Sequence, residues 1–192
     1  MIVLASKSAS RRAMLEAAGV AFTCQPAVID ERALEARAEG AAPGHVARML
    51  SEAKALAIGG GGALVLGSDS LVSVEGRRFD KPAGRDDAAR HLRHFSGRTM
   101  ELHSAAALAR HGAIVWSHAD VARLHVRELS DGFIESYLAA EWPAVAGCVG
   151  VFRIEARGVQ LFDSVQGDHF TVLGMPLLPV LGALRDLGEL PA

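Results

Sequence analysis

The sequence predicts an α/β fold built on a mixed sheet. Short continuous apolar runs, the pattern of buried strands, alternate along the chain with segments whose apolar residues recur at helical spacing, and no segment repeats. Two extended stretches, 99–109 and 114–126, flank the turn His111-Gly112 and indicate a long antiparallel hairpin. Strands separated by helices, together with this hairpin, predict both parallel and antiparallel pairing.

The expected elements follow from these patterns and from their end signals. The first apolar run leads through a polar turn into a helix that we expect Ser10 to cap and Gly19 to end. Ser130 is expected to cap a later helix in the same way. The expected strands cover residues 2–5, 20–28, 63–74, 99–109, 114–126, 149–154 and 159–172, and the expected helices cover residues 11–18, 45–58, 86–95, 131–137 and 177–187.

Two of these segments have irregular features. The polar residues 67–70 interrupt the strand expected over 63–74, and Lys54 falls on the border of the apolar stripe of the helix expected over 45–58. The glycines of 59–62 indicate a flexible connector. Because this connector precedes a strand, it does not direct the N–H groups of a helix at a phosphate.

Length and charge limit the organisation and the partners. The 192 residues are 50% hydrophobic and 22% charged, which fits one domain over residues 1–192, or two tightly merged lobes, around a sizeable core. Twenty basic against 22 acidic side chains give a formal net charge of −2, so no global field attracts nucleic acid or an anionic membrane. Any site for a polyanion must therefore be local.

Hydropathy and cysteine usage predict a cytoplasmic protein. The longest apolar stretch, 172–184, is broken by two glycines and two prolines, and the first residues lack the layout of a secretory signal. Cys24 and Cys148 lie far apart without metal-type spacing, which fits a reducing compartment. The sequence thus predicts neither membrane attachment nor a disulfide scaffold.

Polar residues after the first expected strand form a candidate anion site. Residues 6–12 read Ser-Lys-Ser-Ala-Ser-Arg-Arg and place three hydroxyls and three cations before a helix, whose N-terminus favours an anion. The spacing of a Walker A loop is absent. The alternative is a serine-rich cap followed by solvated arginines.

Charged residues at the ends of other strands are further candidates. Asp69 lies between apolar runs, so its carboxylate must be hydrogen-bonded, paired or bound to a metal, or else stands at a hairpin corner. Lys81 precedes a proline, which favours extended backbone there. Asp30, Glu31 and Glu155 follow strands and either converge on one crevice with Asp69 or are solvated loop residues.

Taken together, these residues resemble the Maf family of nucleoside triphosphate pyrophosphatases over nearly the whole chain. Several family motifs recur in the family's order, and their combination is specific although no single motif is. The matching segments are Leu4-Ala5-Ser6-Lys7-Ser8-Ala9-Ser10-Arg11, Asp30-Glu31, Lys54-Ala55, Gly67-Ser68-Asp69, Lys81-Pro82, Leu92 to Gly97, and Gly167 to Leu177.

The sequence departs from the family pattern at a few positions. Glu155 stands where many members carry glutamine, Ala9 replaces a frequent proline, and Asp80 replaces the common glycine before Lys-Pro. Phe152 with Glu155 is more similar to the subfamily that prefers 7-methyl-GTP than to the one that prefers pyrimidine nucleotides. The departures therefore bear on which base is recognised.

The resemblance implies both a fold and a reaction. The implied fold is a Maf/ITPase-like mixed sheet in two lobes flanking a central nucleotide-binding cleft, often in a homodimer. The implied reaction is hydrolysis of a nucleoside triphosphate between the α and β phosphates, with Mg²⁺ or Mn²⁺ as cofactor. The implied partner is thus a small-molecule nucleotide, without nucleic acid or membrane.

Roles for the candidates follow from the resemblance. Asp69 and Glu31 are expected to hold the metal, and Asp69 also to orient or deprotonate the attacking water. The expected catalytic residues are Asp69, Lys81, Lys54 and Glu31, and the expected substrate-binding residues are Ser6, Ser8, Arg11, Ser70 and Glu155.

Alternatives remain for the base and for the function. Glu155 has the acceptors to recognise the N1 and N2 donors of guanine, or it pairs with Arg153 or Arg157. The alternative functions are a regulatory protein associated with septum formation or nucleic acid, and a nucleotide sensor without catalysis. The slightly acidic chain and the lack of a basic stripe argue against DNA binding.

Overall fold

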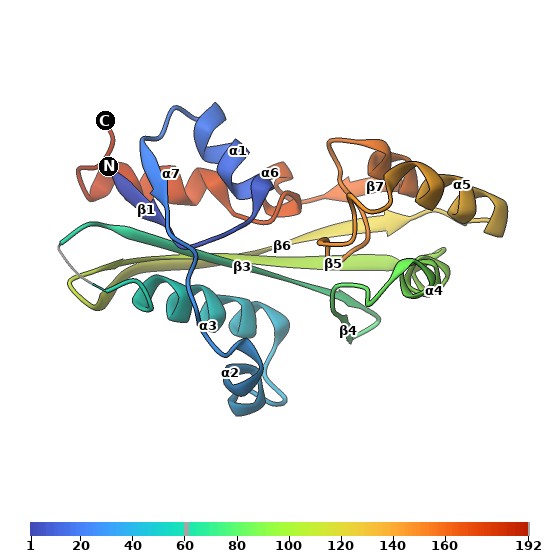
Figure 1. Ribbon diagram of the computed structural model, residues 1–192, viewed down its shortest axis with the longest axis horizontal. Helices are drawn as coiled ribbons and strands as arrows, with labels where there is room; N and C mark the ends of the chain where they lie inside the picture. The colour runs from blue at the N-terminus through green and yellow to red at the C-terminus, as the bar shows by residue number, and fades with distance from the viewer. Residues whose placement is uncertain (60–61, 192) are drawn as a thin grey trace. The chain divides into compact units, whose positions relative to one another are not determined.

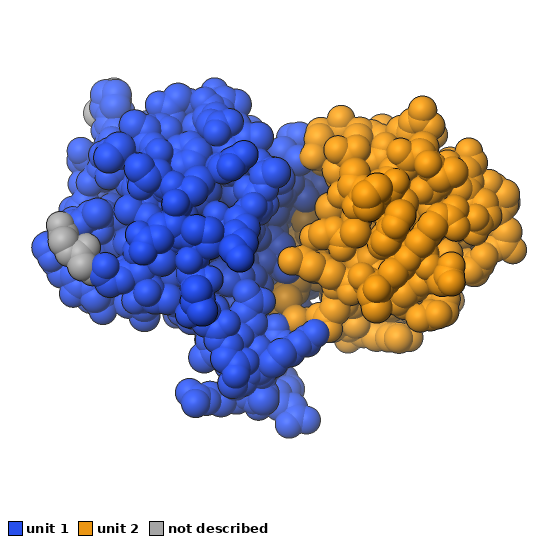
Figure 2. Space-filling model, viewed as in Figure 1, with its two compact units in different colours: residues 1–70, 103–120, 168–192 blue, residues 71–102, 121–167 orange. Residues whose placement is uncertain are grey.

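A computed structural model describes residues 1–59 and 62–191 of the chain. The chain divides into two compact units, shown in different colours in Figure 2. Unit 1 comprises residues 1–70, 103–120 and 168–192, and unit 2 comprises residues 71–102 and 121–167.

Unit 1 consists mainly of the two ends of the chain. Within the described residues, its helices and strands are β1 (Ile2–Leu4), α1 (Ala9–Ala17), β2 (Phe22–Cys24), α2 (Glu31–Arg37), α3 (Pro43–Leu56), α6 (His169–Val172) and α7 (Leu177–Asp186). It also contains parts of three longer strands, β3 (Val65–Val74), β5 (Thr99–Arg110) and β6 (Ala113–Val126).

The sheet of unit 1 is covered by helices on both faces (Figure 1). Helices α1 and α7 cover one face, where Leu15, Leu66, Leu108 and Leu184 belong to one buried cluster. Helix α3 covers the other face, where Ala55 packs with alanines of β5. Because side chains alternate along a strand, β5 contributes to both faces. This arrangement gives unit 1 a core on each side of its strands.

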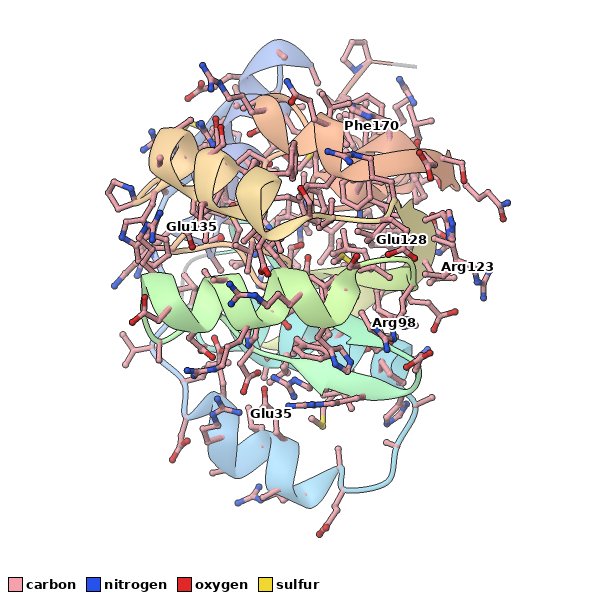
Figure 3. All side chains as sticks on the ribbon, turned by 90° about the vertical axis from the view of Figure 1, so that its right-hand side faces the viewer. Glu35, Arg98, Arg123, Glu128, Glu135 and Phe170 are labelled. Carbon is pink, nitrogen blue, oxygen red and sulfur yellow. The ribbon has the colours of Figure 1, made fainter. Side chains whose placement is uncertain are left out.

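Unit 2 contains β4 (Arg77–Phe79), α4 (Arg85–Phe95), α5 (Asp131–Glu141), a 3₁₀ turn (Arg157–Leu161) and β7 (Phe162–Gln166), with the remaining parts of β3, β5 and β6. Helices α4 and α5 lie side by side, with Glu135 of α5 labelled in Figure 3. Two ion pairs join them, Arg85 to Glu135 at 2.9 Å and Arg93 to Asp131 at 2.6 Å.

The strands form one seven-stranded mixed sheet in the order β2-β1-β3-β5-β6-β7, with β4 paired to β3. Strand β1 is parallel to β2 and to β3, whereas β4 and β7 are antiparallel to β3 and β6. Strands β5 and β6 are paired neighbours joined by His111-Gly112, and so short a connection requires the antiparallel direction. The predictions of a mixed sheet and of the long hairpin are confirmed.

Other sequence expectations are corrected. Strand β3 runs through residues 67–70 without interruption, because their backbone stays in the sheet while their polar side chains find partners. The strand expected over 149–154 is a series of turns, and 159–172 divides into a 3₁₀ turn, β7 and α6. The extended segment expected over 20–28 shortens to β2. The connector expected over 59–62 includes residues 60 and 61, which lie outside the described residues.

Two helix starts were predicted from serine caps, and one of them differs from expectation. Helix α1 begins at Ala9 with Ser8, rather than Ser10, as N-cap, because the Ser10 hydroxyl donates to the Leu173 carbonyl instead. Ser130 caps α5 as expected. In the described part of the chain, no helix combines the length and apolar character needed to cross a bilayer.

Candidate active site

Alternation along β3 divides its polar residues between the two faces of the sheet. A Cβ built on Gly67 would overlap the Ser51 carbonyl oxygen and lie 2.6 Å from the Ala55 nitrogen, so the backbone of α3 packs directly against β3 at this point. Asp69, two residues further, faces the same helix. Ser68 lies on the other face, where its hydroxyl donates to the Ala105 carbonyl at 2.8 Å. A glycine thus allows the approach that brings α3 to the Asp69 carboxylate.

Lys54 of α3 bridges two carboxylates. Its Nζ lies 2.5 Å from Oδ1 of Asp69 and 2.9 Å from Oε1 of Glu31. The side chains of Lys54 and Asp69 are only 13% and 10% exposed, whereas that of Glu31 is 49% exposed. Glu31 is the first residue of α2, which Asp30 caps by accepting from the Ala33 N–H. The sequence did not predict this helix, and it left open whether Glu31 joins a common site with Asp69 or is a solvated loop residue.

Arg11 of α1 is held on the opposite face of β3. Its Nε donates to the Gly174 carbonyl at 2.9 Å, and its Nη1 donates to the Ser68 carbonyl at 2.9 Å and the Ser6 hydroxyl at 3.4 Å. Its Nη2 donates to the Ser70 hydroxyl at 3.0 Å. These bonds use four of the five N–H groups of the guanidinium. Within the described residues, one N–H on Nη2 has no hydrogen-bond partner.

The carboxylates on the α3 side of β3 affect the pKa of Arg11 on the α1 side. Burial lowers the pKa of Arg11 from its ordinary value, and the carboxylates of Asp69 and Glu31 act in the opposite direction. The acids on the α3 side therefore lie within the electrostatic range of the guanidinium on the α1 side. Within unit 1, Glu31, Lys54 and Asp69 are in direct contact, and Arg11 lies on the other face of β3 within the electrostatic range of the two carboxylates.

The carbonyl of Gly174 helps hold Arg11 and was not among the site residues predicted from the sequence. It accepts hydrogen bonds from Arg11 Nε and from the Ser70 hydroxyl, both at 2.9 Å, and it lies 3.3 Å from the Ser68 hydroxyl, whose shorter hydrogen bond goes to the Ala105 carbonyl at 2.8 Å. The φ of Gly174 is +100°, and a Cβ there would lie 3.2 Å from Ser70 Oγ. The glycine of the Gly167–Leu177 motif was the available signal, because only glycine adopts this backbone readily.

A buried polar network extends behind Arg11. The hydroxyl oxygens of Ser70 and Ser104 lie 3.1 Å apart, and Ser104 donates its hydrogen to the Thr171 carbonyl at 2.8 Å. The Thr171 hydroxyl in turn donates to Asp120 at 2.9 Å. Ser70, predicted to bind substrate, uses its hydroxyl in internal bonds that hold Arg11 in place. Its contact with substrate stays a prediction.

The hydroxyls of the turn before α1 make local hydrogen bonds, and Ser6 is buried. Ser6 Oγ accepts from the Ser8 N–H at 3.1 Å, and Ser8 Oγ caps the helix by accepting from the Arg11 N–H at 3.3 Å. Lys7 and Arg12 beside this turn are exposed. The N-terminus of a nine-residue helix with nearby cations suits a phosphate group.

The predicted residues Lys81 and Glu155 belong to unit 2, and both are exposed. Burial raises the pKa of the half-buried Cys148 thiol, Glu155 raises it further, and Lys81 opposes this shift, so both charges lie near Cys148. Among residues 1–59 and 62–191, neither Lys81 nor Glu155 has an ion-pair partner. In particular, Arg153 pairs with Glu141 rather than with Glu155, at 2.8 Å.

The carboxylates at Lys54 fit a divalent cation. The Lys54 ammonium already occupies a cationic position between oxygens of Glu31 and Asp69. In the described part of the chain, no group of three histidine, cysteine or acidic residues is arranged to hold a metal. Mg²⁺ is commonly bound by one or two carboxylates, with phosphate and water oxygens completing its shell, so two acids suffice when a nucleotide is present.

Comparison with known proteins shows which family the chain belongs to. Residues 1–187 match the sequence profile described as "Maf-like protein". The chain is 46% identical over its full length to a 7-methyl-GTP pyrophosphatase of Rhizobium meliloti, covering 98% of that protein. It is 45% identical over 96% of its length to a nucleoside triphosphate pyrophosphatase of Rhodopseudomonas palustris, covering 93% of that protein.

Similarity to a solved structure is weaker. A HAM1 protein from Coxiella burnetii aligns with 65% of this chain and 72% of its own, at 18% identity and a TM-score of 0.40. The family itself rests on the profile match and on the full-length relatives. The chain belongs to the Maf family.

Proposed function

We propose that this protein hydrolyses the α–β phosphoanhydride of a nucleoside triphosphate, releasing the monophosphate and pyrophosphate. The observation that carries the proposal is the Lys54 ammonium held between Glu31 and Asp69 in the unit that also contains Arg11 and the N-terminus of α1. A triphosphate with roughly four negative charges needs such fixed cations and donors. The names of full-length relatives support the same reaction.

The cations of unit 1 are assigned to the phosphate chain. Ser8 and the N-terminus of α1 bind one phosphate, and Arg11 contributes its remaining N–H while its other donors keep the guanidinium fixed. Lys54 compensates the charge that develops as pyrophosphate leaves. Lys81 is assigned the same chemistry from the Lys-Pro motif.

Glu31 and Asp69 are assigned to a divalent cation, Mg²⁺ or Mn²⁺. When bound, such an ion neutralises phosphate oxygens and lowers the pKa of a coordinated water. The carboxylate of Asp69 orients or deprotonates the attacking water. Asp69 belongs to β3, and α3 packs against this strand at Gly67, so the carboxylate is held in one position.

A guanine-type base such as 7-methylguanine is assigned to Glu155. The side chain is exposed, and its arginine neighbour Arg153 is engaged by Glu141. A carboxylate with both oxygens available accepts two hydrogen bonds from the N1 and N2 donors of guanine, which uracil and thymine do not offer as a pair.

A nucleotide panel tests the reaction. GTP, 7-methyl-GTP, UTP and dTTP are incubated with Mg²⁺ or Mn²⁺, and products are separated as monophosphate with pyrophosphate or as diphosphate with phosphate. We expect monophosphate and pyrophosphate only, and the highest kcat/KM for 7-methyl-GTP. Diphosphate as product, or binding without turnover, would reject the proposed reaction.

Variants of the acid then test the assignment. Asp69→Asn should lower kcat by about 100-fold or more while the protein stays folded, because the carboxylate is lost and the shape is kept. Asp186→Asn removes the same charge from an exposed position in the same unit and should retain wild-type turnover. Near wild-type turnover of folded Asp69→Asn would refute the role of Asp69.

A further inference from the structure

The segment that carries Glu155 is a tight turn fixed on both sides. The Ala156 N–H donates to the Arg153 carbonyl at 3.1 Å, which places Glu155 within a turn of four residues. A Cβ on Gly158 would lie 2.5 Å from the Arg153 carbonyl oxygen and 2.7 Å from its nitrogen. The chain therefore folds closely back on Arg153, and Glu155 lies exposed between the two contacts.

A second anchor lies just before this turn. Val151 is fully buried and has a φ of +57°, an unfavourable conformation for a β-branched residue. Its carbonyl accepts a hydrogen bond from the Tyr137 hydroxyl of α5 at 2.9 Å. Burial raises the pKa of this hydroxyl, and the charge of Glu141 raises it further, so the hydroxyl stays protonated and able to donate. Helix α5 thus holds the backbone on the N-terminal side of Arg153.

Arg153 has two carboxylates within electrostatic range but is bonded to only one. Its Nε and Nη2 donate to Oε2 of Glu141 at 3.2 and 2.8 Å. This hydrogen bond is the largest cause of the raised pKa of Arg153, and the charge of Glu155 contributes without a hydrogen bond. Glu141, the last residue of α5, is only 6% exposed, whereas the Arg153 side chain is 38% exposed.

We propose that Glu141 is a specificity-determining positioning residue, which binds Arg153 and thereby keeps the neighbouring Glu155 carboxylate unpaired and available to a guanine-type base. A guanidinium two residues away in the same turn is the natural ion-pair partner of Glu155. Arg153 pairs with the buried Glu141 instead, because an unpaired carboxylate costs more free energy when it is buried than when it is exposed. This proposal rests on the base recognition assigned to Glu155 above.

The variant Glu141→Gln keeps the shape of the side chain and removes its charge. Arg153 is then released to pair with Glu155, and selectivity for 7-methyl-GTP over UTP should fall about tenfold or more, the cost of losing a charge-assisted hydrogen bond. The loss should appear in KM for 7-methyl-GTP, with kcat retained. Unchanged selectivity in the folded variant would overturn the proposal.

A second substitution separates this role from a structural one. In Glu141→Gln with Arg153→Met, no arginine is released, so selectivity should return toward the wild-type ratio. A loss of anchoring alone would leave the double variant as unselective as the single one, which would overturn the proposal. If the single variant does not fold, the double variant is measured instead. Loss of selectivity for 7-methyl-GTP in the double variant would also overturn the proposal.

A structural measurement distinguishes this inference from the proposed function. The crystal structure of Glu141→Gln should show the Arg153 guanidinium in contact with the Glu155 carboxylate. If this contact forms and wild-type protein shows no preference for 7-methyl-GTP, base recognition by Glu155 is wrong and the competition for Arg153 stands. If Arg153 stays in place, the inference fails whatever the substrate.

Discussion

The ammonium nitrogen of Lys54 lies 2.5 Å from the Asp69 carboxylate, so the acid proposed to act on water has a fixed cation as its direct neighbour. The same nitrogen contacts Glu31 at 2.9 Å. Under the metal assignment proposed above, a divalent ion would compete with the ammonium for the same two carboxylates, and its binding would release Lys54 toward phosphate. This competition makes Lys54 the most informative residue to replace.

We expect Lys54→Met to lower kcat/KM by about 100-fold, because a cation that stabilises the transition state is lost. The same variant should bind Mn²⁺ more tightly than wild type, because Glu31 and Asp69 no longer have the ammonium between them. Turnover assays and a Mn²⁺ titration followed by electron paramagnetic resonance measure the two effects.

The control for the Mn²⁺ titration is Lys7→Met, which removes an exposed charge from the same unit without touching these carboxylates. Its Mn²⁺ affinity should equal that of wild type. Weaker or equal Mn²⁺ binding by folded Lys54→Met would show that Glu31 and Asp69 do not hold the ion.

Gly67→Ala should destabilise the protein by about 1–3 kcal/mol, because the added methyl group meets the backbone of α3. Turnover should fall as well, since the helix that carries Lys54 must move. Urea unfolding gives the free energy. Gly132→Ala, with open space around its Cβ and no positive φ, is the control and should be neutral or slightly stabilising. Equal stabilities for the two variants would contradict the close approach of α3.

Arg11→Lys should lose both stability and activity although it keeps the charge. A lysine ammonium cannot reach the carbonyls of Gly174 and Ser68 together with the Ser70 hydroxyl in the geometry of a guanidinium. Each lost bond to the charged group costs about 1.5–3 kcal/mol when its partner stays unsatisfied. Thermal unfolding and kcat/KM measure the effects.

The matched variant Arg12→Lys changes the next residue, which is exposed and makes no side-chain hydrogen bond to the described part of the chain. Its melting temperature should stay at the wild-type value. If Arg11→Lys has the same melting temperature as Arg12→Lys, the polar network around Gly174 does not contribute to stability.

Stability should fall on acidification through His91. Burial lowers the pKa of His91 below its ordinary 6.5, Asp87 opposes this shift, and Arg77, Arg90 and His94 reinforce it. The unfolded chain therefore binds the proton more readily, so stability is fully present above pH 6.5 and is lost as pH falls below it toward the lower folded value.

The variant His91→Phe tests this pH dependence, since a phenyl ring also packs against Phe79 and does not titrate. Denaturant unfolding on either side of pH 6.5 should show a smaller loss of free energy in the variant than in wild type. An identical loss in both proteins would assign the acid sensitivity to other groups.

Local signals in the sequence predicted a large part of the fold. The hairpin of β5 and β6 was predictable because its turn and flanking alternation lie within one continuous stretch. The motifs around Arg11, Lys54 and Asp69 yielded the candidate site residues for the same reason, since each motif is a continuous stretch of sequence. The run 149–154 was misread as a strand because its apolar residues are buried in turns that α5 holds in place.

By itself the sequence determined the mixed α/β class, the helix that Ser130 caps and the choice of candidate residues, since these depend on neighbours along the chain. Only the tertiary structure decided that β3 continues through its polar residues, that Glu31 meets Lys54, and that Glu141 rather than Glu155 holds Arg153. Such pairings depend on how deeply each carboxylate is buried, because an unpaired carboxylate costs more free energy the more deeply it is buried. Burial is set by the packing of the elements and not by the local sequence.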